Sequence, residues 1–286
     1  MKQIKKLVIV LILPIFTSIA YSQTKPVKID LFSNGNKLNA DFYQAIGSDN
    51  YPTFILLPGM PGGEGDIFGL GMKLSSSGIN VLIFNFQGTH SSEGTSSFEN
   101  AMEDVGTAYI FLKKKENIER FNIDTSNIVT GGWSYGGAMA LTAAIYNPDI
   151  KRIISIAGAD ESVFAQRFKS DSAYYKMFHK MMGELIYPKG SIKLKGDIDS
   201  VFEKWISNQD NYDQVKHADA LKDRDILLLG GWKDHNIVLE DHILPLYRKL
   251  QELKAENVKI QVFDTGHGFV NVKGELVETL ARWIKE

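Results

Sequence analysis

The sequence predicts an α/β fold: a mostly parallel, doubly wound sheet with an N-terminal hairpin and an inserted helical cap. Three observations favour this fold. Short β-rich segments alternate with amphipathic helical patterns, which is typical of parallel sheets with crossover helices. Several of the β-rich segments are apolar throughout, as strands covered on both faces are. One stretch of roughly 60 residues interrupts the alternation and is too long for a simple loop.

The β-rich segments begin with two runs, residues 27–32 and 38–45, on either side of Ser33-Asn34-Gly35-Asn36. Turn residues between two such runs indicate an antiparallel hairpin. The later segments are shorter and richer in Val, Ile and Leu, as buried strands are. The strands expected in the sheet are residues 53–57, 80–84, 127–130, 152–157, 225–229 and 258–263.

Helical patterns lie between most of these strands. Residues 98–115 carry an apolar stripe, and residues 135–146 are small and apolar. Residues 239–254 are amphipathic, with a kink or restart expected at Pro245 because proline cannot continue the hydrogen-bond ladder. A last helix carries its apolar residues, from Leu276 to Ile284, on one face.

Residues 160–220 break the alternation. They are rich in Lys, Met, Phe and Tyr and contain helical patches at residues 174–185 and 200–207. We therefore expect a helical cap, inserted at about 160–220 into a domain that spans residues 23–286. Its aromatic and Met side chains are expected to roof the site and to set substrate preference.

Composition limits the possible functions. The chain has 286 residues, 44% of them hydrophobic, which is enough for one sizeable core. Formal net charge is −2, from 32 basic and 34 acidic side chains, and no basic block follows the first six residues, so no nucleic-acid partner is expected. The absence of cysteine excludes disulfides, thiol catalysis and Cys-ligated zinc.

The N-terminal residues have the pattern of an export signal. Lys2, Lys5 and Lys6 precede an apolar run at residues 7–20, and a small-x-small site ends at Ser22. This tripartite pattern predicts a secretory signal peptide at residues 1–22 and a periplasmic or secreted mature protein. The alternative is a retained anchor, but the run of 14 residues is shorter than the ~20 that a bilayer requires, so no stable membrane span is expected after cleavage. Cleavage would change the formal net charge from −2 to −5.

The most informative motif is Gly132-x-Ser134-x-Gly136, placed after a predicted strand and before a predicted helix. A nucleophilic serine needs a sharp strand-to-helix turn that projects its Oγ, and glycine is required where strand and helix crowd that turn. The alternative is a purely structural glycine-rich turn. The helix N-terminus beside the serine would supply N–H groups for a developing oxyanion. Ser134 is therefore the predicted nucleophile.

In this architecture the acid and then the histidine follow the serine along the chain. His267 lies between two glycines after the last predicted strand and is the expected base. Asp234 lies in the loop after the preceding strand and is the expected acid partner, although an aspartate there could instead cap the next helix. Asp241, in a helical pattern, and Asp264, on the His267 loop, are competitors. His242 is expected at the surface of its helix.

An oxyanion hole requires two backbone N–H donors. The residue after the nucleophile, Tyr135, would supply one of them. The second usually comes from the loop after an early strand, and residues 58–63 form such a loop. Met60 is the expected donor there, because Pro61 has no N–H; a purely structural turn is the alternative.

With these residues identified, the chain from about Thr53 to Glu286, cap excepted, resembles the α/β-hydrolase superfamily. It is most similar to the catalytic domain of prolyl oligopeptidase-type serine peptidases and to dienelactone-hydrolase-like esterases. The motifs that carry the resemblance are Gly131-Gly-Trp-Ser-Tyr-Gly-Gly137, Gly231-x-x-Asp234 and Gly266-His-Gly-Phe269. Asn85 and Gln87 depart from the pattern, since relatives more often carry Asp and Arg there.

Such peptidases carry a large propeller ahead of the hydrolase domain, whereas about 30 mature residues precede Thr53 here. The resemblance therefore implies hydrolysis of a small-molecule acyl ester or amide through an acyl-enzyme, with peptide degradation less favoured. Two alternatives remain. One is an acyltransferase that uses the same serine, histidine and aspartate, and the other is a catalytically inactive protein with the hydrolase fold that only binds a ligand. No metal-ligand spacing or phosphate-binding loop is visible, so neither metal nor cofactor is expected.

Overall fold

The computed structural model describes residues 25–47, 49–63 and 65–286; the predicted signal peptide at residues 1–22 lies outside them. The described chain begins with an antiparallel hairpin of β1 (Val27–Ser33) and β2 (Asn36–Tyr43). Asn34 and Gly35 at its turn have φ values of 51° and 78°, the left-handed backbone that a tight hairpin turn requires. The predicted hairpin is confirmed.

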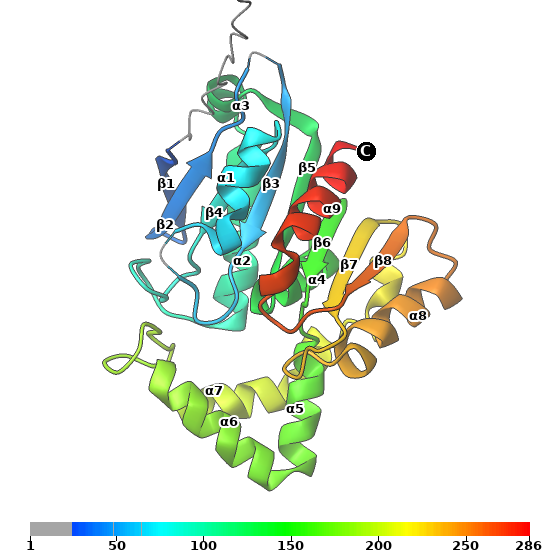
Figure 1. Cartoon of the computed structure of the whole chain (residues 1–286). Coiled ribbons are helices and arrows are strands. Elements are labelled where there is room, and N and C mark those ends of the chain that lie inside the picture. The colour runs from blue at the N-terminus through cyan, green and yellow to red at the C-terminus, as the bar shows by residue number, and fades with distance from the viewer. Residues whose placement is uncertain (1–24, 48, 64) are drawn as a thin grey trace, which may run out of the picture.

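The eight strands of the described residues form one sheet in the order β1-β2-β4-β3-β5-β6-β7-β8 (Figure 1). β2 pairs antiparallel with β4, and every pairing from β4 to β8 is parallel. The mostly parallel sheet is therefore confirmed. The remaining strands are β3 (Tyr51–Leu57), β4 (Asn80–Phe84), β5 (Ile123–Trp133), β6 (Arg152–Ile156), β7 (Asp225–Gly231) and β8 (Val258–Phe263).

Helices cover both faces of the sheet. Side chains along β3 point alternately to the two faces of the sheet, and each face has its own hydrophobic core. Ile55 and Leu57 belong to the first core, and Phe54 and Leu56 belong to the second. The first face carries α2 (Phe98–Leu112), α4 (Tyr135–Tyr146) and α8 (Leu244–Glu252), and the second carries α1 (Leu70–Ser76) and α9 (Lys273–Lys285). None of the helices in the described ranges has the length and apolar character needed to cross a bilayer.

Several helices differ from the sequence prediction. The predicted helix at residues 98–115 ends at Leu112, and a separate helix, α3 (Lys115–Phe121), follows it. The predicted helix at 239–254 begins as a π-helical turn (Leu239–Ile243) and restarts as α8, with Pro245 in the first turn of α8, where its missing N–H costs nothing. The predicted restart is confirmed.

Between β6 and β7 the chain forms three helices, α5 (Glu161–Ser170), α6 (Ser172–Leu185) and α7 (Ile198–Ser207). Figure 1 shows them as a separate group at one end of the sheet. They have a small core of their own, in which Phe202 and Trp205 are almost fully buried. This is the helical cap that the sequence predicts.

The two ends of the cap meet at the sheet. The Gln214 side chain donates to the backbone carbonyl of Ala159 at 2.7 Å, and its backbone N–H donates to Asp160 at 3.2 Å. Asp160 also accepts from the Ser162 N–H and so caps α5. The cap therefore leaves and re-enters the sheet at one place.

Candidate active site

Ser134 occupies the sharp turn between the last residue of β5 and the first residue of α4. Its φ and ψ are 56° and −120°, a conformation that is strained for any residue with a side chain. Its N–H donates to the Ile156 carbonyl on β6 at 2.9 Å, and its carbonyl accepts from the Ala138 N–H in α4 at 3.0 Å. These bonds hold the turn and leave Oγ free to project from the sheet.

The glycines on either side are required by close packing. A Cβ at Gly132 or at Gly136 would collide with the backbone carbonyl oxygen of Leu57 on β3. Backbone atoms cannot move aside as a side chain can, so neither position accepts a larger residue without distortion. The motif thus brings β3, β5 and α4 together beneath the serine.

A continuous line of hydrogen bonds joins three residues at the carboxyl end of the sheet. His267 Nε2 lies 3.0 Å from Ser134 Oγ, and His267 Nδ1 lies 2.7 Å from Asp234 Oδ2. The serine comes from the β5–α4 turn, the aspartate from the loop after β7 and the histidine from the loop after β8. The structure therefore brings together the three residues that the sequence singles out.

The loops after β7 and β8 hold each other in place. The Lys233 N–H donates to the Thr265 carbonyl at 2.9 Å, and Gly231 has no Cβ to obstruct that carbonyl. Trp133, next to the serine, donates its indole N–H to the His267 carbonyl at 2.8 Å, and its ring packs against the imidazole with centroids 5.0 Å apart. The imidazole position is therefore fixed by neighbours on two other elements.

The Asp234 side chain is completely buried, while the His267 side chain is 18% exposed. Burial alone would raise the pKa of Asp234. The hydrogen bond from His267 and the backbone N–H groups of Ile237 and Asn236 outweigh burial and hold that pKa below its usual value. The carboxylate therefore stays charged and can orient the imidazole.

The competing aspartates lie elsewhere. Asp264 is exposed and pairs with Lys233 at 2.8 Å. Asp241 is exposed at the edge of the pocket described below. Asp234 is the aspartate that bonds to His267.

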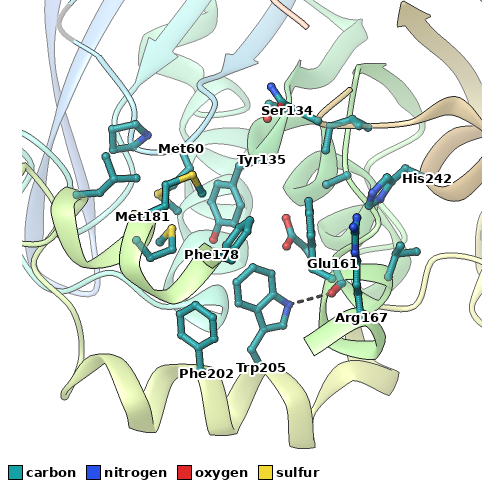
Figure 2. Close-up of a pocket in the computed structure, with 18 of the residues that line it drawn as sticks. Met60, Ser134, Tyr135, Glu161, Arg167, Phe178, Met181, Phe202, Trp205 and His242 are labelled. Carbon is teal, nitrogen blue, oxygen red and sulfur yellow. Dashed lines mark hydrogen bonds between the residues drawn. The ribbon is translucent and has the colours of Figure 1, made fainter. Parts of the chain in front are cut away.

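Both predicted oxyanion donors lie beside the serine. Tyr135 is the first residue of α4, where a helix leaves its backbone N–H without an intrahelical acceptor. Met60 lies in the turn after β3, which is closed by a hydrogen bond from the Gly62 N–H to the Gly59 carbonyl at 2.6 Å. A Cβ added to Gly59 would lie 3.3 Å from that of Ser134, so this turn passes close to the nucleophile. Met60 and Tyr135 line the same pocket as Ser134 (Figure 2).

That pocket has a volume of about 550 Å³ and lies between the carboxyl end of the sheet and the cap. Most of its wall is apolar and aromatic, as in pockets that enclose an organic ligand. Figure 2 shows Ser134 at one side and cap side chains at the other. The cap side chains that line it include Phe164, Tyr174, Phe178, Met181, Phe202 and Trp205.

The prediction that His242 lies at the surface is wrong. His242 is only 6% exposed and lines the pocket, where its ring lies 5.0 Å from that of Phe164. Its Nδ1 accepts the Asp160 N–H at 3.1 Å. Burial lowers the pKa of His242 to about 4, so the ring is neutral at pH 7. The π-helical turn changes the face on which residue 242 lies, and the sequence pattern carries no clear sign of such a turn.

Sequence reasoning also missed Glu161, the first residue of α5. Its carboxyl lies in the pocket wall, and the residue is 3% exposed. An acidic residue in the first turn of a helix usually interacts with the helix N-terminus at the surface, so the sequence contains no sign of burial. Among the described residues no group of three or more His, Asp or Glu side chains could hold a metal ion.

A sheet of this order, with a serine at the turn before the helix that follows β5, defines an α/β-hydrolase. The family model for the prolyl oligopeptidase family matches residues 68–286. The chain belongs to that family and is a serine hydrolase, as its motifs predict. Among proteins with curated descriptions, none matches the chain by sequence.

Solved structures show the same fold. Est1E from Butyrivibrio proteoclasticus has a TM-score of 0.62 and 13% identity over 91% of this chain and 97% of its own. An esterase from Pyrococcus furiosus has a TM-score of 0.64 and 17% identity over 92% of each chain. A monoacylglycerol lipase from Paleococcus ferrophilus has a TM-score of 0.60 and 18% identity over 87% of this chain and 98% of its own.

Proposed function

We propose that the protein is a carboxylesterase with Ser134 as nucleophile, His267 as general base and Asp234 as the acid partner of His267. The observation that carries the proposal is the hydrogen-bonded line from Ser134 Oγ through His267 to the buried Asp234. It lies at the wall of an apolar pocket large enough for an organic acyl ester.

In the first half-reaction, His267 Nε2 accepts the hydroxyl proton while Ser134 Oγ attacks the ester carbonyl carbon. The tetrahedral intermediate collapses, the bond to the alcohol breaks, and the alcohol leaves with the proton from His267. Water then attacks the acyl-enzyme with His267 again as base, which releases the acid and restores Ser134. The backbone N–H groups of Tyr135 and Met60 would stabilise the oxyanion in both halves.

The pocket wall favours esters over peptides. A peptide backbone presents an N–H and a carbonyl at every residue, and each needs a partner when it is buried. The cap side chains that face the pocket are mostly Phe, Met, Leu and Ile, which cannot supply such partners, and the indole N–H of Trp205 already donates to the Glu161 carbonyl. The likeness to an esterase from Pyrococcus furiosus, and to Est1E, one structure of which holds bound ferulic acid, agrees with an ester substrate.

The proposal includes export. The basic N-terminus, the apolar run and the small residues up to Ser22 support cleavage before Gln23 and a periplasmic or secreted enzyme. N-terminal sequencing of protein recovered from the extracytoplasmic fraction tests this part. A chain that still begins at Met1, or that stays in the cytoplasm, would contradict it.

Labelling with a fluorophosphonate, followed by mass spectrometry, tests the catalytic part. The wild type should carry one label at Ser134, and Ser134→Ala should carry none and lose about 10⁶-fold in kcat. Ser170→Ala, which removes an exposed cap serine, is the matched control and should label as the wild type does. A label on another serine, or ester hydrolysis by folded Ser134→Ala at a rate close to that of the wild type, would overturn the proposal.

A further inference from the structure

The Glu161 carboxyl has no role in the chemistry above. The residue is 3% exposed and lines the pocket that contains Ser134. Its backbone carbonyl accepts the Trp205 indole N–H at 2.9 Å, but no described residue forms a hydrogen bond or ion pair with its carboxyl. In Figure 2 that carboxyl points into the space between the sheet and the cap. Burying a carboxyl group without a hydrogen-bond or ion-pair partner destabilises the fold. Such a group in a native structure therefore indicates a functional role.

The groups around Glu161 carry an excess of negative charge. Asp160 precedes it, and Glu99 accepts from the Tyr212 hydroxyl at 3.4 Å; the charges of both Glu99 and Glu161 act on Tyr212. Burial, and after it the charge of Glu161, raises the pKa of Tyr135 on α4 well above its usual value. Burial and the charge of Asp160 raise the pKa of Glu161 itself to about 8.

The basic groups nearby do not neutralise this charge. Arg167, further along α5, places its guanidinium 3.7 Å from the centre of the Tyr174 ring and is exposed. His242, across the pocket, is neutral at pH 7 because burial lowers its pKa. The inner part of the pocket therefore combines an uncompensated carboxyl with aromatic faces, the two features that attract an organic cation.

We propose that Glu161 determines specificity by binding an ammonium group on the ester substrate. The carboxylate would hold the charge, and the rings of Trp205 and Phe178 on the pocket wall would contact the carbon atoms that surround it. The inference rests on the proposed esterase function, because the ammonium group would orient the ester towards Ser134.

The proposal predicts a definite dependence on pH. A cation binds most tightly to the ionised carboxylate, and the free pocket holds Glu161 protonated below about pH 8. The preference for a cationic ester should therefore be small at pH 6, rise with the ionised fraction of Glu161 as the pH approaches 8, and level off above pH 8. Below that range only cation–π contact with the rings remains.

The test compares each cationic ester with its carbon isostere. Choline butyrate and 3,3-dimethylbutyl butyrate differ only in the charged nitrogen of the alcohol part. Methyl esters of 4-(trimethylammonio)butyrate and 5,5-dimethylhexanoate place the same difference in the acyl part. A quaternary ammonium keeps its charge at every pH, and the ratio of kcat/KM within a pair cancels the titration of the catalytic groups. In at least one pair the ratio at pH 8.5 should favour the cation by roughly tenfold or more.

Glu161→Gln removes the charge and keeps the shape of the side chain. It should hold that ratio, at every pH, at the low value that the wild type shows at pH 6, while the neutral isostere is still hydrolysed. Glu203→Gln, the same change on the exposed face of α7, is the matched control and should keep the wild-type ratio. A thermal melt of each variant shows whether it is folded.

A wild-type ratio near one in both pairs, or a ratio that Glu161→Gln leaves unchanged, would overturn the inference. In either case hydrolysis of the neutral isosteres would still support the proposed esterase. No hydrolysis of any of the four esters, together with no fluorophosphonate label, would instead remove the proposed function itself.

Discussion

At the residue scale, the sharp turn between β5 and α4 that carries Ser134, called the elbow below, depends on the space that Gly132 and Gly136 leave for the carbonyl oxygen of Leu57. Gly132→Ala should lower the free energy of unfolding by about 1–3 kcal/mol, because the added methyl meets backbone atoms that cannot rotate away. Gly106→Ala in α2, where an added Cβ meets nothing within 4 Å, should instead raise it by about 0.5–1 kcal/mol. Urea denaturation measures both changes. Equal changes in the free energy of unfolding for the two variants would mean that the backbone around Gly132 can move to accept the added methyl group.

The buried aspartate offers a second prediction. In Asp234→Asn the amide cannot hold the imidazole in the productive tautomer, so kcat should fall about 10⁴-fold. Ser134→Ala and His267→Ala should each cost about 10⁶-fold, and a double variant should cost little more because the residues act as a unit. Steady-state kinetics on a neutral ester measures these losses.

Asp264→Asn is the matched control for that prediction. Asp264 lies on the His267 loop, but its carboxylate is exposed and pairs with Lys233. Its replacement should change kcat less than twofold. A loss as large as that of Asp234→Asn would mean that the loop, and not the Asp234 hydrogen bond, limits activity.

The sequence identifies Ser134, His267 and Asp234 because each belongs to a local pattern: a glycine-flanked turn, a glycine-flanked loop or a loop after an apolar strand. Whether their atoms meet depends on the strand order, and no local pattern contains that order. Glu161 could not be identified in this way. In the sequence it is an acidic residue in the first turn of a helix, a common position for a surface residue. Its burial follows from the packing of α7 against α5 in the folded cap.

At the scale of the elements, the cap has its own core and can weaken without unfolding the sheet. Phe202 is 1% exposed and packs against Phe168 with ring centroids 5.2 Å apart. Phe202→Ala should destabilise the cap by about 3–5 kcal/mol. KM should then rise for esters with long acyl chains and change little for acetyl esters, which can bind beside Ser134 alone.

Hydrogen exchange provides the structural measurement for this variant. Amides in α5, α6 and α7 should exchange faster, while those of β5 and β6 keep their protection. Phe32→Ala is the control, because Phe32 on the edge strand β1 is 55% exposed and should affect neither exchange nor KM. An equal rise of KM for acetyl and long-chain esters would contradict a role of the cap in acyl preference.

The elements themselves differ in how well sequence predicts them. β7 is predicted because an unbroken apolar run follows Asp225, and β1 and β2 because the turn residues Ser33-Asn34-Gly35-Asn36 separate them. α1 and α3 are missed because each has only seven residues, too few for a helical period to be clear. β5 begins before its predicted residues because Ile123 pairs with Tyr51 in the folded sheet, although polar residues separate it from the apolar run.

At the scale of the whole molecule, buried ionisable groups set how stability varies with pH. The pKa of Glu161 is raised to about 8 from 4.5, so the folded state binds its proton more tightly and stability falls as pH rises through this range. Asp104 and Asp160, each raised to about 6, act in the same sense at lower pH. His242, lowered to about 4, acts in the opposite sense, and its contribution is complete above pH 6.5.

Between pH 6.5 and 8, Glu161 therefore dominates. The free energy of unfolding of the wild type should fall by roughly 1–2 kcal/mol across this window, and that of Glu161→Gln should stay nearly constant. Urea denaturation at closely spaced pH values measures the slope. Glu203→Gln, an exposed change of the same kind, should keep the wild-type slope. A flat wild-type profile would mean that Glu161 titrates near its ordinary pKa.

The meeting of the two cap ends at Ala159 and Gln214 has a consequence for how this enzyme could diversify. The chain can leave β6 and return to β7 without altering the register of either strand, whatever lies between. Loop-closure entropy grows slowly, by about 0.6 kcal/mol for each doubling of the inserted length. Inserts of different size and sequence could therefore be exchanged at this junction over evolutionary time, and substrate range would change while the elbow, its histidine and its aspartate are inherited intact.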